Sequence, residues 1–405
     1  MPIRDIPPEA TQLDPGAAPP AGEGHEAAYF DNNATTPLDP RVVGAMLPWL
    51  ASQHGNPSSA HGFGRAARAA VDRAREQVLS AIGGQDGDLV FLSSGTEANN
   101  AVLLDRAAAS GFKGRVVFSS LEHASIRSRA QQLEEAGIEA FEVRPDGQGV
   151  ATAASFAPAI DSRACLVCLM LANNEIGTLQ PVAEVADLAH AAGAPLLCDA
   201  VQAVGKVPVD VRALGADYLV IGGHKFHGPS GAAALYVAPG AELRPLLMGA
   251  GQERGRRSST ENVAAIVGLG EACAIAAREL EERHAKLLAL RDRFEAGLER
   301  FEAVVVHGKD APRLPHTSHV AFLGLVAHDL MMWLDGRGHA VSTGAACHSG
   351  KPQASWACRQ MGLPEHESLA SLRVSFGLTN SEEEVDRLLA ALAVGVPLLR
   401  RAFAG

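Results

Sequence analysis

The chain of 405 residues has few aromatic side chains, few cysteines and no long apolar run. Phe, Trp and Tyr make up 5% of it, and six residues are cysteine. Six cysteines in a chain of this length do not make a disulfide framework, so we expect a reducing compartment, the cytoplasm. The longest apolar runs, such as 164–172, are far shorter than the roughly 20 residues that cross a bilayer. We therefore expect no membrane association.

An excess of positive charge is also absent. The chain holds 35 Lys and Arg against 46 Asp and Glu, a net charge of -11, which repels a phosphate backbone and argues against a nucleic-acid partner. Apolar residues reach 47% and charged residues 20%, which excludes wholesale disorder, collagen and coiled coil. Glycine is abundant, with 41 residues, and this excess favours tight turns or close approach of the backbone to a ligand.

The length predicts about two to three domains. Residues 1–28 are rich in proline, alanine and acids and are expected to form a flexible N-terminal leader. From residue 88 onward, short apolar runs alternate with helical patterns, which is typical of βα units and a mostly parallel sheet. The predicted strands are 88–92, 115–119, 164–171, 195–198, 218–221 and 233–237, and the predicted helices are 97–109, 125–136 and 182–192. Gly137 and Gly193 stand where helix C-caps belong.

The pattern changes after Arg257, where residues 262–300 predict one or two long helices. Strand-like segments and helices then alternate as in a smaller α+β domain. The expected strands there are 304–307, 318–322 and 372–376, and the expected helices are 327–334 and 382–394. We therefore expect the leader over 1–28, a large α/β domain over 29–265, whose first residues can pack on the small domain, and a small α+β domain over 266–405.

The run Ser94-Gly95-Thr96-Glu97 follows a predicted strand and opens a helix. Its backbone N–H groups and the Thr96 hydroxyl point where an anion binds at a helix N-terminus. The run is either a phosphate cradle or an ordinary capped helix with a glycine turn. This stretch alone does not decide between the two.

Lys225 and Asp199 follow or end buried strands. Burial of an unpaired ammonium is costly and lowers its pKa, which is what an amine needs to form an imine with an aldehyde. Asp199 lies at the strand end where open α/β sheets bind ligands. The alternatives are a solvated loop lysine and an aspartate that caps a helix. An imine-forming lysine and an acid partner for a pyridinium nitrogen are together what pyridoxal phosphate requires.

Several motifs occur in order between residues 28 and 395. They are Asp31-Asn32-Asn33-Ala34-Thr35-Thr36-Pro37, Gly55-Asn56-Pro57-Ser58-Ser59, Ser94-Gly95-Thr96-Glu97-Ala98-Asn99-Asn100, Glu122-His123, Ala172-Asn173-Asn174-Glu175, Asp199-Ala200-Val201-Gln202, Gly223-His224-Lys225 and Gln252-Glu253-Arg254-Gly255. Together they resemble the cysteine desulfurase branch of the class V aminotransferase-like, fold-type I pyridoxal phosphate enzymes. The resemblance implies an α/β fold with a large, mostly parallel, cofactor-binding sheet domain and a smaller C-terminal α+β domain.

The same resemblance implies roles for individual residues. Lys225 forms the imine with the cofactor, Asp199 holds the pyridinium nitrogen, and His123 stacks on the ring and is a second group for moving protons. The remaining implied contacts are Gln202 and Asn174 at the cofactor hydroxyl and the substrate region, and Gly95, Thr96 and His224 at the phosphate.

Two further positions bear on phosphate binding. Thr260 matches the position that reaches the phosphate from the neighbouring subunit, which implies a homodimer with shared sites. Gly222 departs from the family, which commonly has a serine there that bonds the phosphate. Either a neighbour or water replaces that hydroxyl, or the phosphate is held less tightly.

A stretch of small residues near the C-terminus holds Cys347. A thiolate is a good nucleophile toward sulfur, and small residues leave it exposed. His348 either lowers the pKa of Cys347 or is only a polar loop residue. Arg373 resembles the family arginine that clamps the substrate carboxylate, and a surface arginine on a strand is the alternative.

The resemblance implies a cysteine desulfurase that converts L-cysteine to L-alanine and leaves the sulfur on Cys347 as a persulfide. A partner that accepts the sulfur, such as an iron–sulfur scaffold protein, is then expected. The alternatives are a selenocysteine lyase acting on L-selenocysteine, another aminotransferase or lyase of the superfamily, and a catalytically silent scaffold. Intact Lys225, Asp199 and Cys347 argue against the scaffold.

We expect no metal site, because no cluster of His, Cys and carboxylate residues has the spacing of metal ligands along the sequence. The sequence assigns no role to Cys358, His316 or His319.

Overall fold

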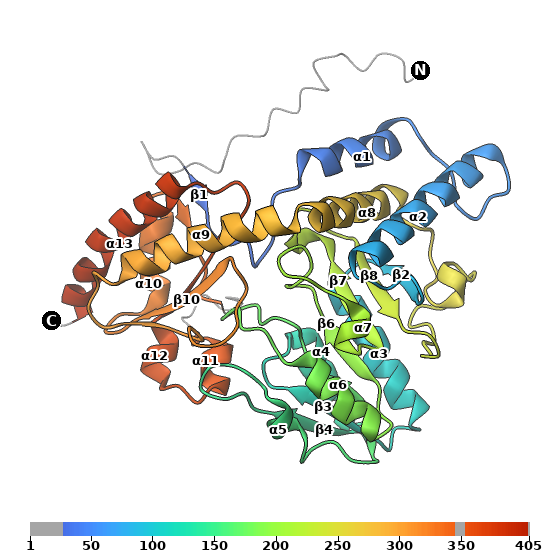
Figure 1. Cartoon of the computed structure of the whole chain (residues 1–405), viewed down its shortest axis with the longest axis horizontal. Coiled ribbons are helices and arrows are strands. Elements are labelled where there is room, and N and C mark those ends of the chain that lie inside the picture. The colour runs from blue at the N-terminus through green and yellow to red at the C-terminus, as the bar shows by residue number, and fades with distance from the viewer. Residues whose placement is uncertain (1–26, 345–352, 404–405) are drawn as a thin grey trace.

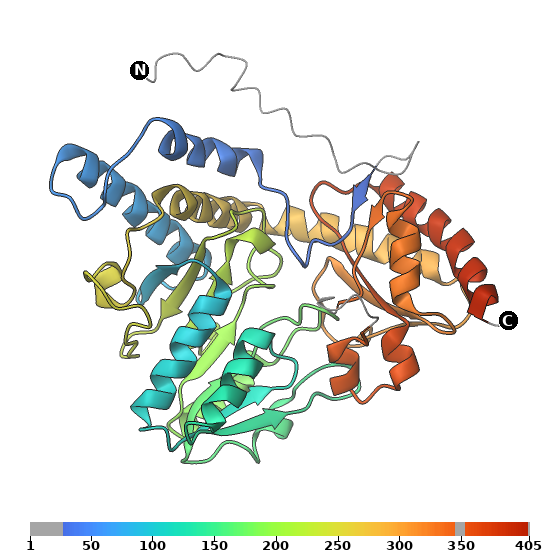
Figure 2. The ribbon, with the colours of Figure 1, turned by 180° about the vertical axis from the view of Figure 1, so that it is seen from behind.

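The computed structural model describes residues 27–344 and 353–403 (Figure 1). A large α/β unit with the central sheet lies beside a smaller unit that holds the C-terminus, and the view from behind shows the same division (Figure 2). The predicted nucleophile Cys347 and its neighbour His348 lie outside the described residues.

The large unit is built on a sheet that has seven strands within the described residues, in the order β2-β8-β7-β6-β5-β3-β4. Neighbouring strands are parallel except in the two pairs that β8 makes. The mostly parallel sheet predicted from the alternating pattern is therefore confirmed. The strands are β2 (Asp88–Leu92), β3 (Arg115–Ser119), β4 (Glu139–Val143), β5 (Ala164–Cys168), β6 (Leu196–Asp199), β7 (Tyr218–Gly222) and β8 (Ala233–Val237).

Helices cover both faces of this sheet, which is why its central strands are apolar without interruption. Alternate residues of β7 point to opposite faces. Leu219 and Ile221 belong to one core, and Tyr218 and Val220 belong to the other. The first core also holds residues of α2 (Gly62–Ala81), α6 (Val182–Ala191) and α8 (Val263–Arg278), and the second holds residues of α3 (Gly95–Ala109) and α4 (Ala124–Glu134).

The end of α6 shows how a single glycine sets a helix boundary. Gly193 has φ +77, a left-handed conformation that glycine adopts without steric cost. Its N–H donates to the carbonyl of His190, and the N–H of Ala194 donates to the carbonyl of Ala189. These bonds satisfy carbonyl groups that the helix leaves free, as predicted for a C-cap glycine.

The small unit has an antiparallel sheet in the order β12-β10-β9. Its core lies between this sheet and three helices. The elements are β9 (Val304–Val306), β10 (Thr317–Phe322), β12 (Ser371–Ser375), α9 (Leu280–Leu298), α10 (Ala327–Asp335) and α13 (Glu382–Phe403). The short strand β1 (Ala28–Tyr29) pairs in parallel with β11 (His339–Ala340), so the start of the described chain packs on the small unit.

The division between the two units lies at Glu279. Helix α8 packs on α1 (Pro40–Ala51) and α2, whereas α9 packs on α13 and β10. Residue 265, the boundary expected from the sequence, falls inside α8, and we therefore place the boundary between α8 and α9.

Some elements differ from the sequence expectation. Helices α1 and α2 and strand β4 were not predicted. The predicted strand 164–171 ends at Cys168, and the N–H of Met170 donates to the buried carboxyl of Glu122 instead of to a neighbouring strand.

The remaining short elements connect these layers. They are α5 (Ala153–Phe156), α7 (Val211–Leu214), η2 (Gly223–Lys225), η3 (Glu253–Gly255), α11 (Trp356–Gln360) and α12 (Glu365–Leu369). In the described part of the chain, no helix combines the length and the apolar character needed to cross a membrane.

Two helical glycines provide a test of the packing of α8 on α2. A Cβ at Gly270 in α8 would lie 2.6 Å from Cα of Ala74, whereas a Cβ at Gly44 in α1 would meet nothing within 4 Å. We expect Gly270→Ala to lower the free energy of unfolding by about 1–3 kcal/mol through overpacking. The matched control Gly44→Ala should raise it by about 0.5–1 kcal/mol. Urea unfolding measures both, and equal effects would contradict the tight α2–α8 contact.

Candidate active site

The candidate site is a pocket of about 520 Å³ at the carboxyl edge of the large sheet. Open α/β sheets bind ligands at this edge. Asp199 ends β6, Lys225 lies in η2 directly after β7, and His123 follows β3. The small unit contributes Arg373 from β12, and the segment after β1 contributes Asp31. The pocket therefore lies where the two units meet.

Most of the predicted site residues line this one pocket. They are Gly95, Thr96, His123, Asn174, Asp199, Gln202, His224, Lys225 and Arg373. Thr260 is exposed and is not among the lining residues. Cys347 lies outside the described residues, but Gly344, close before it in the chain, lines the pocket.

Lys225 points its amine into this pocket. Its Nζ donates to the carbonyl oxygens of Asn33 at 2.8 Å and Ala34 at 2.6 Å. Burial, and then the charge of Arg373, lower the pKa of Lys225 to about 8, against the opposing effect of the carboxylates of Asp31 and Asp199. With that pKa, roughly a tenth of the amine is neutral at pH 7. The site thus holds an amine that is partly available as a nucleophile.

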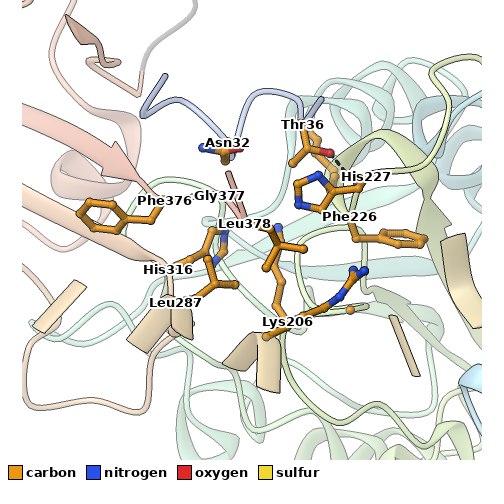
Figure 3. A pocket seen from close by; sticks show the side chains of 13 residues that line it. Asn32, Thr36, Lys206, Phe226, His227, Leu287, His316, Phe376, Gly377 and Leu378 are labelled. Atoms are coloured by element: carbon orange, nitrogen blue, oxygen red, sulfur yellow. Dashed lines mark hydrogen bonds between the residues drawn. The ribbon is translucent and has the colours of Figure 1, made fainter. Parts of the chain in front are cut away.

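A second amine lies behind Lys225. Lys206 is 4% exposed, and its Nζ donates to Oε1 of Gln202 at 3.0 Å. Nε2 of Gln202 donates at 2.9 Å to the carbonyl of Asn33, which also accepts from Lys225. Figure 3 shows Lys206 beside a small cavity that His316 also lines. Burial lowers the pKa of Lys206 well below its usual value, and Lys206 fixes which end of the Gln202 amide faces the pocket.

Asp199 presents a buried and oriented carboxylate. Its Oδ2 accepts from Nδ2 of Asn99 at 2.9 Å, and its Oδ1 accepts from the N–H of Val201 at 3.0 Å. The residue is 7% exposed. A fixed carboxylate in such surroundings is suited to pair with a cationic nitrogen of a ligand.

His123 caps helix α4 and faces the same pocket. Its Nδ1 accepts from the N–H of Ser125 at 3.2 Å, which leaves the proton of the neutral ring on Nε2. Burial lowers the pKa of His123, the carboxylate of Asp199 opposes this effect, and the charge of Lys225 lowers the pKa further. The ring is therefore a neutral imidazole that can accept or donate a proton.

The N-terminus of α3 is the run that the sequence left open between an ordinary capped helix and a phosphate cradle. Ser94 caps the helix, because its Oγ accepts from the N–H of Glu97 at 3.1 Å. The carboxylate of Glu97 is bound by Arg257 at 2.8 Å and so faces away from an incoming anion. Gly95 and Thr96 line the pocket, and the first N–H groups of a helix have no partner within it. The helix is therefore capped, and the predicted phosphate cradle at Gly95 and Thr96 lies at the pocket wall and stays a prediction.

His224 lies beside this cradle. Burial lowers the pKa of His224 to about 4, and the charges of Lys225 and Lys206 contribute. Its Nδ1 lies 3.3 Å from Oγ1 of Thr35. The imidazole is therefore neutral at pH 7 and contributes a hydrogen-bonding group rather than a charge.

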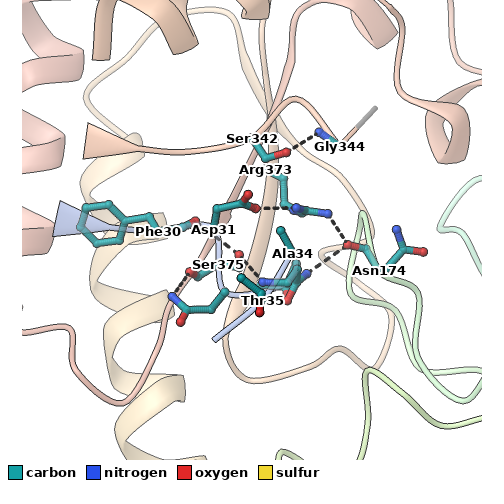
Figure 4. Close-up of polar contacts among 12 residues, drawn as sticks. Phe30, Asp31, Ala34, Thr35, Asn174, Ser342, Gly344, Arg373 and Ser375 are labelled. Carbon is teal, nitrogen blue, oxygen red and sulfur yellow. Dashed lines mark hydrogen bonds and ion pairs between the residues drawn. The ribbon is translucent and has the colours of Figure 1, made fainter. Parts of the chain in front are cut away.

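Arg373 is the cation on the small-unit side of the pocket (Figure 4). Its Nη2 donates to Oδ1 of Asp31 at 2.5 Å, and its Nη1 donates to the carbonyl of Asn174 at 2.8 Å. Its Nε is buried and has no hydrogen-bond partner among the described residues. The guanidinium is therefore oriented from two sides and retains donor capacity for a carboxylate.

The side chain of Val201 limits the space around Gly222. A Cβ there would lie 3.2 Å from Cγ1 of Val201, which is close enough that the valine would have to move. Val201 lines the pocket and Gly222 does not. The branched side chain of Val201 thus occupies the space next to this strand end.

Fold and pocket together define a class of protein: a fold-type I enzyme, whose site holds a lysine, an aspartate and a helix N-terminus at the carboxyl edge of the large sheet. Residues 28–388 match the family model described as aminotransferase class-V. The chain belongs to the aminotransferase class-V family, and curated relatives about 40% identical to it are cysteine desulfurases.

Two of these relatives cover nearly the whole chain. A cysteine desulfurase of Cereibacter sphaeroides is 42% identical over 378 residues, which are 93% of this chain and 97% of the relative. The cysteine desulfurase IscS of Methanosarcina thermophila is 38% identical over 377 residues, 93% of each chain. Among solved structures, a NifS-like protein has a TM-score of 0.87 and 33% identity, over 92% of this chain and 100% of that one.

Some pocket residues received no role from the sequence. Asp31, Asn33 and Asn99 lie within the sequence motifs that indicate the site, but the sequence did not predict their contacts. Nothing in the sequence pointed to Lys206. Its partner Gln202 lies four residues earlier, on an irregular segment without helical or strand periodicity.

The low pKa of Lys225 can be tested directly. We expect modification of Lys225 in the cofactor-free protein by trinitrobenzenesulfonate, followed by peptide mass spectrometry, to be half-maximal near pH 8. In Arg373→Leu the half-point should move to higher pH, because a nearby positive charge that disfavours the ammonium is gone. Lys225→Ala provides the blank. A half-point that stays in place after Arg373→Leu would show that Arg373 does not act on this amine.

Proposed function

We propose that this protein is a pyridoxal phosphate-dependent cysteine desulfurase that forms L-alanine and a persulfide on Cys347. The observation that carries the proposal is one pocket that holds the Lys225 amine, the Asp199 carboxylate, the His123 imidazole and the Arg373 guanidinium. Similarity to curated cysteine desulfurases over 93% of the chain supports it. A solved structure described as SspA in complex with cysteine, with a TM-score of 0.76 and 30% identity, supports the choice of substrate.

The residues of the pocket fit the chemical groups of this cofactor. It has a phosphate, a ring nitrogen and an aldehyde, and the pocket offers a helix N-terminus, a buried carboxylate and an amine of lowered pKa. The residues that would hold it are Gly95, Thr96 and His224 at the phosphate, Asp199 at the ring nitrogen, His123 at the ring, Gln202 and Asn174 at the hydroxyl and Lys225 at the aldehyde. When bound, the cofactor supplies an electron sink for negative charge at the substrate α-carbon.

Arg373 would orient the substrate through its carboxylate. The guanidinium is fixed by Asp31 and by the carbonyl of Asn174, and a bidentate pair with a carboxylate adds direction as well as energy. Asn174 lines the pocket next to this position. An α-amino acid held at its carboxylate then has its amino group and α-carbon toward Lys225.

Lys225 and His123 are the groups that would move the α-proton. Each has a pKa lowered by burial, so each has a neutral form near pH 7 that accepts a proton. Lys225 is held by the carbonyl oxygens of Asn33 and Ala34, which accept hydrogen bonds from its amine and so orient it.

The sulfur is transferred to Cys347. Its thiolate attacks the substrate sulfur, the bond between sulfur and the substrate β-carbon breaks, and the β-carbon gains a proton to give alanine. The enzyme then carries Cys–S–SH. The outer sulfur passes to a thiol acceptor, or an added thiol reduces the persulfide, which releases sulfide and oxidises the thiol to a disulfide. A reduced thiol is required in each turnover, which fits the cytoplasm that the cysteine usage favours.

We expect Cys347→Ala to lower alanine and sulfide formation from L-cysteine by about 100-fold or more, because a positioned nucleophile is worth several kcal/mol. The cofactor absorbance should be unchanged. Anaerobic incubation with quantification of alanine and sulfide measures the effect, and Cys165→Ala, which removes a partly exposed thiol on β5, is the matched control. Full sulfide release by Cys347→Ala would favour another lyase of the superfamily. If the native protein turns over L-selenocysteine rapidly and L-cysteine negligibly, it is instead a selenocysteine lyase.

We propose further that two copies share their sites through Thr260, which is exposed and outside the pocket of its own chain. We then expect activity to return when Lys225→Ala chains and Thr260→Ala chains are mixed after reversible dissociation. Each mixed dimer has one site in which both Lys225 and the partner's Thr260 are native. Unmixed Lys225→Ala should stay inactive, and unmixed Thr260→Ala should bind the cofactor weakly. Mixtures that show only the mean of the two variants would contradict a shared site.

A further inference from the structure

Three side chains outside the active-site pocket form a buried polar cluster in the small unit. His319 lies on β10, His307 directly follows β9, and Cys358 lies in α11. The two histidines are joined across the sheet by the hydrogen bond from the N–H of His307 to the carbonyl of His319. Their exposed fractions are 3% for His307 and 0% for His319 and Cys358. The cluster is therefore closed to solvent.

The donor atoms of the cluster converge on one point. Nδ1 of His307 lies 2.9 Å from Nδ1 of His319, and Sγ of Cys358 lies 3.6 Å and 3.8 Å from these two nitrogens. Donor atoms around a tetrahedral zinc ion, with bonds of about 2.0–2.1 Å to nitrogen and 2.3 Å to sulfur, are about 3.3–3.6 Å apart. The distance from Sγ of Cys358 to His307 already matches this spacing, and the distance to His319 is about 0.2 Å longer. The two nitrogens need to separate by about 0.4 Å.

The surroundings of His307 are those of a metal ligand. Its Nε2 lies 2.9 Å from Oε1 of Glu367, and a carboxylate that accepts from the outer nitrogen fixes the tautomer that leaves Nδ1 free for a metal. Oγ of Ser371 lies 3.7 Å from Sγ of Cys358, and a tetrahedral ion would take its fourth ligand from this oxygen or from a water molecule. Nε2 of His319 is buried and has no partner among the described residues.

The electrostatics of the cluster are also suited to a cation. Burial lowers the pKa of His307 and His319, so both rings are neutral. The hydrogen bond between the two Nδ1 atoms uses the proton of the His319 ring, and that proton moves to Nε2 of His319 when both Nδ1 atoms bind a cation. Burial raises the pKa of Cys358 to about 12, so a thiolate forms there only if a cation compensates its charge. A divalent ion of borderline softness meets both conditions.

We propose that His307, His319 and Cys358 bind one zinc ion in a closed structural site. Binding replaces the thiol proton of Cys358, which leaves to solvent, by a zinc–sulfur bond. The site was not visible in the sequence, because its three ligands come from separate segments that share no short spacing. It is independent of the proposed reaction, since none of its residues lines the active-site pocket.

The position of the site indicates what the ion would hold together. Cys358 and Glu367 belong to α11 and α12, and the two histidines belong to the sheet of the small unit. Helix α11 follows the stretch of small residues that holds Cys347. A zinc ion would therefore fix the C-terminal anchor of that stretch to the sheet.

The proposal predicts one tightly bound zinc ion per chain. The holoenzyme is expressed in zinc-supplemented medium, passed over a chelating resin and analysed for metals by mass spectrometry. Native chain, Cys347→Ala and Cys165→Ala should retain about one equivalent, and Cys358→Ala and His319→Asn should retain less than a tenth of it. Circular dichroism and cofactor absorbance confirm that the variants are folded. A native chain without zinc, or with copper instead, would overturn the assignment, as would variants that retain the metal.

Cobalt gives a second measurement that does not depend on variant stability. Protein expressed in minimal medium with cobalt should show a thiolate-to-cobalt charge-transfer band and the intense visible bands of a tetrahedral ion. Both should persist in Cys347→Ala, which removes the thiol of the proposed nucleophile, and the charge-transfer band should vanish in Cys358→Ala. Octahedral spectra, or a band lost in Cys347→Ala instead, would place the cobalt elsewhere and contradict the proposal.

Discussion

The pocket between the two units is organised around buried positive charge. Lys225, Lys206 and Arg373 all lie within or directly behind it, and burial lowers the pKa of both lysines. The carboxylates of Asp31 and Asp199 compensate this charge in part. Bringing several cations out of water is costly unless anions accompany them. A ligand with a phosphate, followed by a substrate with a carboxylate, supplies the charge that such a pocket lacks.

The segment that follows β1 holds this charged pocket together. It pairs with the small unit through β11 and through a bridge between Asp31 and Ser375. A few residues later, the N–H of Thr36 donates to the carbonyl of His224, and the carbonyl of Asn33 accepts from Lys225. A short extended segment thus reaches from the small sheet to the lysine turn. The backbone carbonyls that it brings are neutral acceptors, so they hold the Lys225 amine without raising its pKa as carboxylates would.

Much of the large unit was predictable, because parallel strands covered on both faces appear as uninterrupted apolar runs and end at residues with chemical roles. Asp199, Lys225 and Gly95 were placed correctly at strand or helix ends for this reason. The interactions between such ends were not predictable. The chain from Lys206 through Gln202 to Asn33 joins segments that are distant in the sequence, and His307, His319 and Cys358 meet only after the small sheet has formed. Periodicity carries no information on contacts of this kind.

The small unit also controls where the segment carrying Cys347 begins and ends. Before it, Gly344 donates its N–H to Oγ of Ser342, and a Cβ on Gly344 would lie 3.0 Å from Oε2 of Glu175. After it, the hydroxyl of Ser355 donates to the same Oε2 at 2.7 Å. Both ends of the segment therefore meet at one buried carboxyl group beside the pocket. Fixing the ends of a short segment removes much of the entropy cost of bringing its middle to a given point. Glu175 thus fixes where the two described ends of this segment leave the body of the fold.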